Sequence, residues 1–272
     1  MRFTTTGFCR LSICAAALMQ GAAIGGVINM LKDALSSEDE AGFGGGMWLR
    51  IMPLGASITY GVKSTDGNGY RKVLRDKIVA YGNDVNMVGS RRNGTMEDND
   101  VEGWPGYIID QVHTVVKTSL PKYKPNLVLV NVGTNDCSGN VDIPNAGKRL
   151  SSMLDDVYAG SARATVVLST LLVRADAAKQ KCVLDVNAQY RAVAAAQRSN
   201  GRRIVLADMQ PPAGPTTAEL VDDGTHPTDA GYAKMAAVWL QGLRDADDAG
   251  FLLTKEAIPG NADGVPDRGV YG

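Results

Sequence analysis

The sequence of 272 residues is short of histidine and has no excess of charge of one sign. It contains two histidines, and its 28 Lys and Arg residues against 29 Asp and Glu residues leave a formal net charge of -1 at pH 7. The basic residues are spread thinly among acidic ones, so the chain has no basic stripe of the kind that binds a nucleic-acid backbone. Nucleic acid is therefore not an expected partner, and any chemistry that needs an imidazole has two candidates.

Two common ligand-binding patterns are also incomplete. The glycine-containing stretch 66–69 follows a polar loop, and Lys72 stands where a dinucleotide-binding fingerprint needs its third glycine. Oxygen-bearing side chains alternate over 136–142 as in a calcium loop, but Val141 and Gly147 occupy the places of its glycine and its bidentate glutamate. We therefore expect no cofactor and no metal.

The two ends of the chain differ in composition from its middle. Basic residues precede an uncharged stretch, 11–31, and small residues at 21–23 suit signal-peptidase cleavage, so residues 1–23 are expected to be a secretory signal peptide. The alternative is an uncleaved membrane anchor formed by residues 11–31, which are numerous enough to span a bilayer. The remaining segments are expected to be a flexible linker (24–46), a globular domain (47–250) and a loose C-terminal tail (251–272).

The middle of the chain alternates between strand and helix patterns. Short apolar runs predict five buried strands, at 51–54, 85–88, 127–132, 165–168 and 204–207. Apolar residues at helical spacing predict helices at 70–81, 108–116, 150–157, 183–194 and 228–243. Pro121 is expected to end the second helix. This order predicts an α/β fold, a three-layer α/β/α sandwich with a five-stranded parallel sheet, in which ligands bind beyond the carboxyl ends of the strands.

Ser57 and His226 are the residues that suggest chemistry. Ser57 follows the first strand in a turn of small residues, near the free N–H groups of a helix N-terminus, although a helix cap is the simpler explanation of this serine considered alone. His226 lies in a glycine-containing turn before the last helix. There Asp223, three residues earlier, is within reach of the imidazole Nδ1–H and leaves Nε2 for a serine. His113 lies within a helix among valines, where a structural or surface role is expected.

Together these segments resemble the SGNH, or GDSL-type, hydrolases, because all four sequence blocks of that family occur in their usual order between residues 48 and 243. The resemblance implies a flavodoxin-like SGNH hydrolase fold and a serine esterase activity. It implies a catalytic triad of Ser57, Asp223 and His226. It also implies an oxyanion hole formed by the N–H groups of Ser57 and Gly89 and by the side-chain amide of Asn135.

The residues around Ser57, which form the first of these blocks, and residues 103–106 are most similar to microbial, notably fungal, carbohydrate esterases of the acetyl xylan esterase type. This resemblance implies acetyl esters of plant cell-wall carbohydrate as substrates, with Tyr70 and Trp104 as candidate substrate-binding residues that stack on a sugar ring. One departure is Ala56, which stands where the family usually has aspartate. That aspartate is not the triad acid, so the departure bears on efficiency and not on the type of reaction.

Two alternative functions stay open at this point. One is a lipid-directed esterase or lysophospholipase of the same family. The other is a secreted carbohydrate-binding protein without activity, for which Ala56 is the only indication. No membrane partner is expected once the signal peptide is cleaved.

The four cysteines fall into two pairs. Cys9 and Cys14 lie within the expected signal peptide. Cys137 follows the Asn135 block, and Cys182 lies at the start of the helix after the fourth strand, so both are expected near the same edge of the sheet. Two cysteines that remain in an exported protein are expected to form a disulfide.

Overall fold

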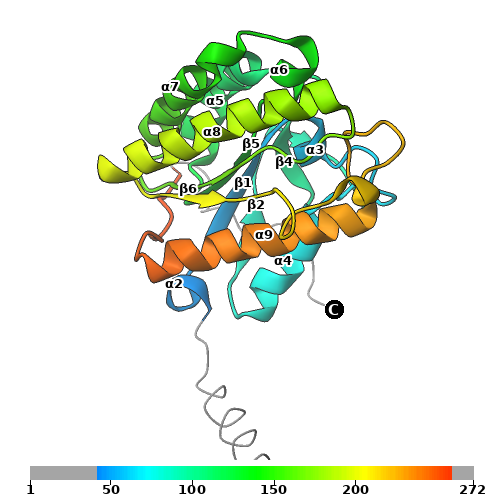
Figure 1. The fold of residues 1–272 in the computed structure, drawn as a ribbon. Coiled ribbons are helices and arrows are strands. Elements are labelled where there is room, and N and C mark those ends of the chain that lie inside the picture. Colours follow the sequence, from blue (N-terminus) through cyan, green and yellow to red (C-terminus); the bar gives the residue numbers. More distant parts are fainter. Residues whose placement is uncertain (1–41, 259–272) are drawn as a thin grey trace, which may run out of the picture. The chain divides into compact units, whose positions relative to one another are not determined.

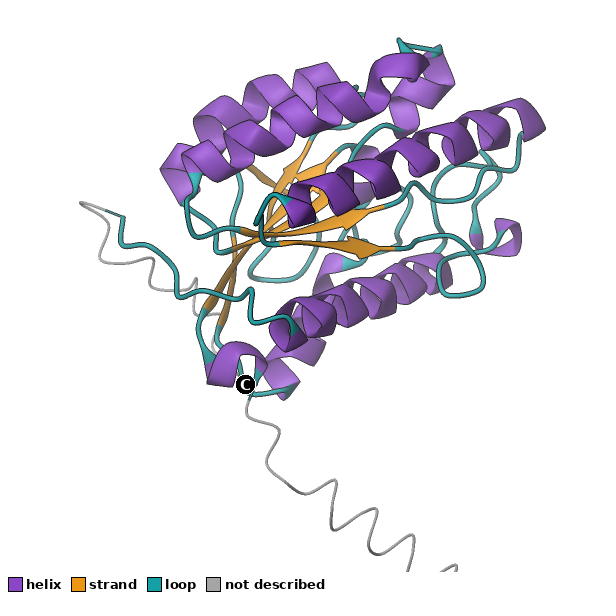
Figure 2. Cartoon of the chain, turned by 60° about the vertical axis from the view of Figure 1, so that its left-hand side comes forward, coloured by secondary structure: helices purple, strands orange, loops and turns teal. Residues whose placement is uncertain are grey.

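A central sheet lies between two layers of helices in residues 42–258, the part of the chain that the computed structural model describes (Figures 1 and 2). The seven strands are β1 (Leu49–Gly55), β2 (Val85–Met87), β3 (Arg91–Arg92), β4 (Asp100–Gly103), β5 (Leu127–Asn131), β6 (Thr165–Ser169) and β7 (Ile204–Ala207). The expected signal peptide, the alternative anchor over 11–31, and most of the predicted linker and tail lie outside the described residues.

The helices cover both faces of the sheet. Over one face lie α5 (Ile109–Tyr123), α7 (Ala146–Gly160) and α8 (Ala177–Ser199), and over the other lie α4 (Arg71–Ala80) and α9 (Asp229–Asp248). The shorter helices are α2 (Phe43–Gly46), α3 (Ser57–Tyr60), α6 (Thr134–Gly139) and the 3-10 turns η1 (Ile143–Asn145) and η2 (Thr217–Glu219). The three-layer arrangement confirms the predicted fold class.

Alternation along the strands explains why there are two cores. In β1, Leu49 and Ile51 face the layer of α4 and α9, whereas Met52 and Leu54 face the layer of α5, α7 and α8. All seven residues of β1 are buried. A strand that is buried on both faces has a nearly continuous apolar sequence, which is why this strand could be predicted.

Two strands share one edge of β1. On its other edge β1 pairs in parallel with β5, and β6 and β7 follow. On the shared edge, β2 pairs with residues 49–51 and β4 pairs with Leu54 and Gly55. The main chain leaves the sheet after β2, forms the short antiparallel strand β3, and returns as β4.

Pro53 lies in β1 at the gap between β2 and β4. The carbonyls of Ile51 and Gly55 accept hydrogen bonds from Val88 and Trp104, so the odd-numbered residues of β1 direct their backbone groups to this edge. Proline has no N–H to donate. The gap therefore explains how a proline is accommodated in a central strand.

Two predictions about the elements were wrong. The sheet has seven strands instead of five, because residues 90–103, where no strand was predicted, contain β3 and β4. Their polar composition concealed them. In addition, α5 continues past Pro121 to Tyr123, where Lys124 adopts a left-handed conformation (φ 42°). A proline in the last turn removes one hydrogen bond, and the N–H of Lys124 still closes the helix on the Leu120 carbonyl at 2.9 Å.

The folded domain also extends beyond the predicted limits 47–250 at both ends. Phe43 is buried, and its ring centroid lies 5.3 Å from that of Tyr81. After α9, the Phe251 carbonyl accepts a hydrogen bond from the Thr165 hydroxyl at 2.6 Å, and Leu252 is buried. Phe43 and Leu252, which lie outside the predicted limits, therefore pack in the core of the domain.

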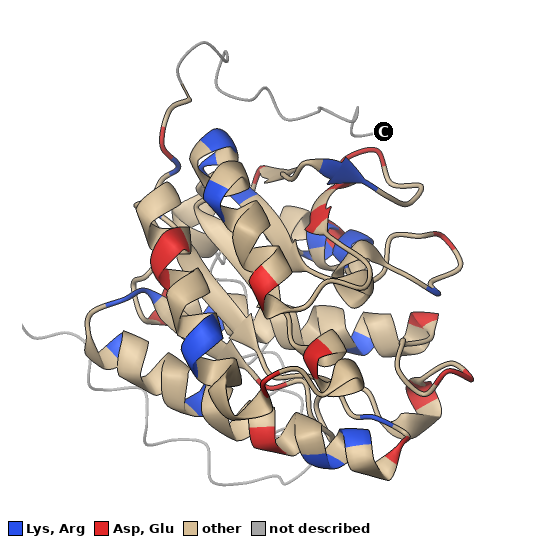
Figure 3. Cartoon of the chain, turned by 90° about the horizontal axis from the view of Figure 1, so that it is seen from above, with Lys and Arg blue, Asp and Glu red and all other residues tan. Residues whose placement is uncertain are grey.

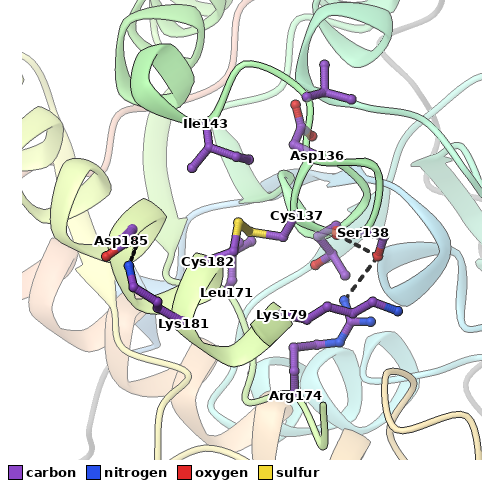
Figure 4. The surroundings of a disulfide bond; sticks show 12 residues. Asp136, Cys137, Ser138, Ile143, Leu171, Arg174, Lys179, Lys181, Cys182 and Asp185 are labelled. Atoms are coloured by element: carbon purple, nitrogen blue, oxygen red, sulfur yellow. Dashed lines mark hydrogen bonds and ion pairs between the residues drawn. A yellow bond between two sulfur atoms is a disulfide. The ribbon is translucent and has the colours of Figure 1, made fainter. Parts of the chain in front are cut away.

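The predicted disulfide is confirmed. Cys137 on α6 and Cys182 on α8 are bonded and close a loop with a sequence separation of 45 residues (Figure 4). The bond fastens a short six-residue helix to one of the longest helices of the domain.

Replacement of both Cys137 and Cys182 by serine should destabilise the domain. In the chain-entropy model a closed loop of this length is worth about 4 kcal/mol, and measured values for such bonds run from about 2 to 4 kcal/mol. Urea unfolding of the two proteins under non-reducing conditions measures the difference. A loss below about 0.5 kcal/mol would show that the crosslink restrains the unfolded chain very little.

Candidate active site

The expected site residues lie beyond the carboxyl ends of the parallel strands. Ser57 begins α3 directly after β1, Gly89 follows β2, Asn135 lies in α6 after β5, and His226 lies between β7 and α9. Figure 1 shows α3 and α6 at the same end of the sheet. The topology thus brings together segments that are up to 169 residues apart in the sequence.

Ser57, His226 and Asp223 form a continuous line of hydrogen bonds. The Ser57 Oγ lies 2.8 Å from the His226 Nε2, and the His226 Nδ1 lies 2.7 Å from the Asp223 Oδ2. Ser57 is 8% exposed. When Nδ1 carries the proton that is donated to the carboxylate, Nε2 presents its lone pair to the serine hydroxyl. The arrangement can therefore remove a proton from the serine.

Asp223 also holds the turn that carries His226. Its Oδ1 accepts hydrogen bonds from the backbone N–H groups of Thr225 and His226, both at 2.9 Å. Burial opposes the negative charge, but the hydrogen bonds from His226 and Thr225 outweigh it and lower the pKa of the Asp223 carboxyl below its ordinary value. The carboxylate therefore stays charged to a lower pH than a free aspartate and keeps the imidazole in place.

Asn135 is half-buried, and its amide is oriented by the loop after β4. The Asn135 Nδ2 donates to the Tyr107 carbonyl at 2.8 Å. An amide nitrogen carries two hydrogens, so this bond occupies one N–H and leaves the other for a ligand.

The buried carboxylate of Asp136 fixes the helix on which Asn135 lies. Asp136 accepts hydrogen bonds from the Ile109 N–H at 3.1 Å and from the Arg149 Nη1 at 2.7 Å. Burial opposes the positive charge of Arg149, but the hydrogen bond and the charge of Asp136 outweigh it and raise the pKa of the guanidinium. The ion pair thus links α6 to α7, and the backbone bond links α6 to α5.

Gly89 occupies a place where no side chain fits. A Cβ at this residue would lie 2.2 Å from the carbonyl carbon of Val101 and 2.4 Å from its oxygen. Among the hydrogen bonds of residues 42–258, none is donated by the Gly89 N–H. The close passage of β4 therefore explains the glycine, and its N–H is available to a ligand.

Two sequence-predicted residues lie elsewhere. Tyr70, a predicted substrate-binding residue, is fully buried beside Trp239 with ring centroids 5.6 Å apart, so that prediction was wrong. Burial also raises the pKa of its phenol well above the ordinary value. Tyr70 directly precedes α4, which packs on the sheet, and its place after a polar loop in the sequence misled the prediction. His113 forms a 2.7 Å contact with Asp156 between α5 and α7, away from Ser57.

Trp104 is half-buried at the rim of the site. The Arg91 guanidinium lies 4.8 Å from its ring centroid, and the Tyr107 ring stacks on it at 5.2 Å. The same guanidinium lies 4.6 Å from the ring of Tyr60. A row of three aromatic rings and one cation therefore borders the loop after β4. Binding of substrate by Trp104 stays a prediction.

Two buried polar residues near the site were missed by sequence reasoning. Arg174, in the loop after β6, donates to the Ser138 hydroxyl at 3.2 Å (Figure 4), and the N–H of its neighbour Ala175 donates to the Gly224 carbonyl at 3.1 Å. This loop therefore supports both α6 and the turn of His226. Glu102 on β4 is the second, and it is fully buried. Neither stands in a pattern that distinguishes a buried charge from an exposed one.

Charged residues of both signs are interspersed over the domain (Figure 3). Within residues 42–258, no three His, Cys, Asp or Glu side chains gather in a way that could hold a metal ion.

Comparison with known proteins identifies a family. Residues 54–234 match the GDSL-like lipase/acylhydrolase family. A multidomain esterase from Ruminococcus flavefaciens is 27% identical in an alignment 256 residues long that covers 82% of this chain, and the chain spans about a third (32%) of that relative's length.

Solved structures show the same fold. A family 3 carbohydrate esterase from Clostridium thermocellum superposes with a TM-score of 0.66 at 23% identity, over 74% of this chain and 98% of that one. A mutant acetyl esterase crystallised with acetate superposes with a TM-score of 0.63 at 23% identity, over 72% and 99% of the two chains. The family match covers well over half of the sequence and includes Ser57, Gly89, Asn135, Asp223 and His226. The resemblance noted in the sequence is thereby confirmed: the chain belongs to the GDSL-like lipase/acylhydrolase family, a family of carboxylic ester hydrolases.

Proposed function

We propose that this chain is a secreted serine esterase that removes short acyl groups, acetyl foremost, from plant cell-wall carbohydrate. The observation that carries the proposal is the line of hydrogen bonds from Asp223 through His226 to Ser57. Family membership supports the reaction class. The similarity to a carbohydrate esterase and to an acetyl esterase supports the choice of substrate.

In the first half-reaction, the His226 Nε2 takes the proton of Ser57 while the Oγ bonds to the acyl carbon. The electron pair of the carbonyl double bond moves to its oxygen. The negative charge that develops there accepts hydrogen bonds from the N–H groups of Ser57 and Gly89 and from the second N–H of the Asn135 amide. The carbon–oxygen bond to the alcohol then breaks as His226 donates its proton to the leaving oxygen.

In the second half-reaction, a water molecule attacks the acyl group on Ser57 in the same way. His226 takes one proton of the water and returns it to the serine as the acid leaves. Throughout, the Asp223 carboxylate stabilises the imidazolium, and it keeps the neutral imidazole in the tautomer that carries its proton on Nδ1. The lowered pKa of Asp223 supports this role, because the carboxylate is charged wherever the imidazole can act as a base.

The surface of the domain favours a small and polar substrate. Within residues 42–258, the one large hydrophobic residue that is exposed is Leu184, on α8. A lipid-directed enzyme needs extended apolar surface to take up an acyl chain, since each buried methylene is worth about 0.8 kcal/mol. The loops that border Ser57 are instead rich in Asp, Asn, Gly and Arg.

Export is supported by the pattern of residues 1–23 and by the disulfide between Cys137 and Cys182, since such bonds persist in oxidising compartments. No helix within residues 42–258 is long and apolar enough to cross a membrane.

Ser57→Ala and His226→Ala should each abolish nearly all hydrolysis of p-nitrophenyl acetate, because the residues act as one unit. His113→Ala is the matched control, since it removes the other histidine and should keep kcat within about twofold while the fold of all variants stays intact by circular dichroism. Turnover of Ser57→Ala at the wild-type rate would refute the assignment of the nucleophile.

Asn135→Ala should lower kcat by about 100- to 1,000-fold and leave KM nearly unchanged, since the amide acts mainly on the charge of the transition state. Steady-state kinetics with p-nitrophenyl acetate test this, with the exposed Asn140→Ala on the same segment as a control. A change confined to KM would assign Asn135 to substrate binding instead.

The rate should fall as the acyl chain lengthens. Among p-nitrophenyl esters, acetate should give the highest kcat/KM and octanoate a value at least about tenfold lower. Within residues 42–258 Leu184 is the one exposed large hydrophobic residue, so there is little apolar surface on which a longer chain could gain about 0.8 kcal/mol per methylene. Acetylated xylo-oligosaccharides should release acetate. A preference for octanoate together with inert acetylated sugars would favour the lipid-directed alternative, and a wild type inert toward every ester would favour a binding protein.

A further inference from the structure

Glu102 is a fully buried carboxylate beside the predicted oxyanion hole. It accepts three hydrogen bonds, from the Ser90 N–H at 2.8 Å, the Ser90 hydroxyl at 2.6 Å and the Trp104 indole N–H at 2.7 Å. Transfer of a carboxylate from water into a protein is costly unless donors replace its hydration. A charged group that is so fully satisfied therefore fixes the positions of its donors.

The first of these bonds ends the pairing of β2 with β1. In the parallel ladder the Val88 N–H donates to the Ile51 carbonyl, so the next bond of the same series would run from the Ser90 N–H to the Pro53 carbonyl. The Ser90 N–H is instead donated to Glu102. Gly89 thus lies between one residue that is bonded to β1 and one that is bonded to Glu102, and this change of partner sets the direction of its own N–H.

The indole bond reaches the second oxyanion donor. The backbone N–H of Trp104 donates to the Gly55 carbonyl at 3.0 Å. The backbone carbonyl of Trp104 accepts a hydrogen bond from the Tyr107 N–H at 3.0 Å. The Tyr107 carbonyl in turn accepts from the Asn135 amide at 2.8 Å. The path from Glu102 to Asn135 therefore passes through the indole hydrogen bond, the Trp104 side chain, one turn and the hydrogen bond from Asn135 to Tyr107.

We propose that Glu102 is a positioning residue for the oxyanion hole: its carboxylate holds Ser90 and Trp104 so that the Gly89 N–H and the Asn135 amide face the same point beside Ser57. The inference rests on the proposed function. It assigns a role to an acid that touches neither the substrate nor the triad.

Glu102→Gln tests this with little change of volume. The amide has one acceptor oxygen, so its NH2 group must face either the Ser90 N–H or the Trp104 indole N–H, donor against donor. We expect kcat on p-nitrophenyl acetate to fall by about 10- to 100-fold with KM within about twofold, because displaced donors weaken transition-state binding alone. Trp104→Phe keeps an aromatic ring, although a smaller one, and removes one donor, and it should lower kcat by about 3- to 10-fold.

Asp98→Asn is the matched control. Asp98 is also a buried carboxylate in the segment between β2 and β4. It accepts hydrogen bonds from the Met87 N–H at 3.0 Å and from Arg75 at 2.6 Å, and it has no hydrogen bond to Ser90 or Trp104. It should lower the Tm and leave kcat within about twofold at temperatures well below that Tm.

The outcomes separate the two hypotheses. An active wild type whose Glu102→Gln and Trp104→Phe variants keep wild-type kcat would overturn the positioning role and leave the esterase function intact. A loss in KM alone, or an equal loss of kcat in Asp98→Asn, would also overturn it, since either points to substrate contact or to general destabilisation. A wild type inert toward acetate esters would refute the proposed function, and the inference with it.

Discussion

The structure depends on the edge of β1 that two strands share. β2 pairs with residues 49–51 and β4 with Leu54 and Gly55, and Pro53 marks the gap between them. If β2 had continued along β1, its chain would occupy the place of β4 and Gly89 would lie within a regular ladder. The break instead turns the chain out of the sheet one residue after Val88, and it brings β4 so close that only glycine fits at residue 89. The interruption of strand pairing between β2 and β4 thus forms one side of the site.

The opposite side of the site is formed by a helix too short to hold itself in place. α6 has six residues, and isolated helices of that length are unstable in water. Three contacts from other elements fix it: the disulfide to α8, the ion pair of Asp136 with Arg149 on α7, and the bond from Ile109 on α5. Each comes from a different helix, so the direction of the Asn135 side chain is determined by the packed layer as a whole.

The sequence predicted what apolar patterns can show. β1, β5, β6 and β7 are buried on both faces, so their apolar runs located them to within one or two residues. β4 was missed because Asp100 and Glu102 give it the composition of a loop. Nothing in a polar tetrapeptide shows that the Glu102 carboxylate is buried and accepts three hydrogen bonds. Tyr70 failed for the converse reason. The residues before it are polar, but at the start of α4 its ring lies in the core against Trp239. The residues proposed as nucleophile, base and acid could be predicted because their motifs are typical of that chemistry, whereas the supporting contacts depend on distant segments.

Three carboxylates hold the three loops that carry the site. Asp223 accepts the N–H groups of Thr225 and His226, Asp136 accepts that of Ile109, and Glu102 accepts that of Ser90. In a loop or at the start of a helix, the backbone N–H groups have no partner in a strand or in the same helix, and a buried donor without an acceptor costs about 1–3 kcal/mol. An acidic side chain supplies the missing hydrogen-bond acceptor and fixes the position of the segment that donates to it. The hydrogen-bonding requirement of the fold and the geometric requirement of the proposed ester hydrolysis are therefore met by the same side chains.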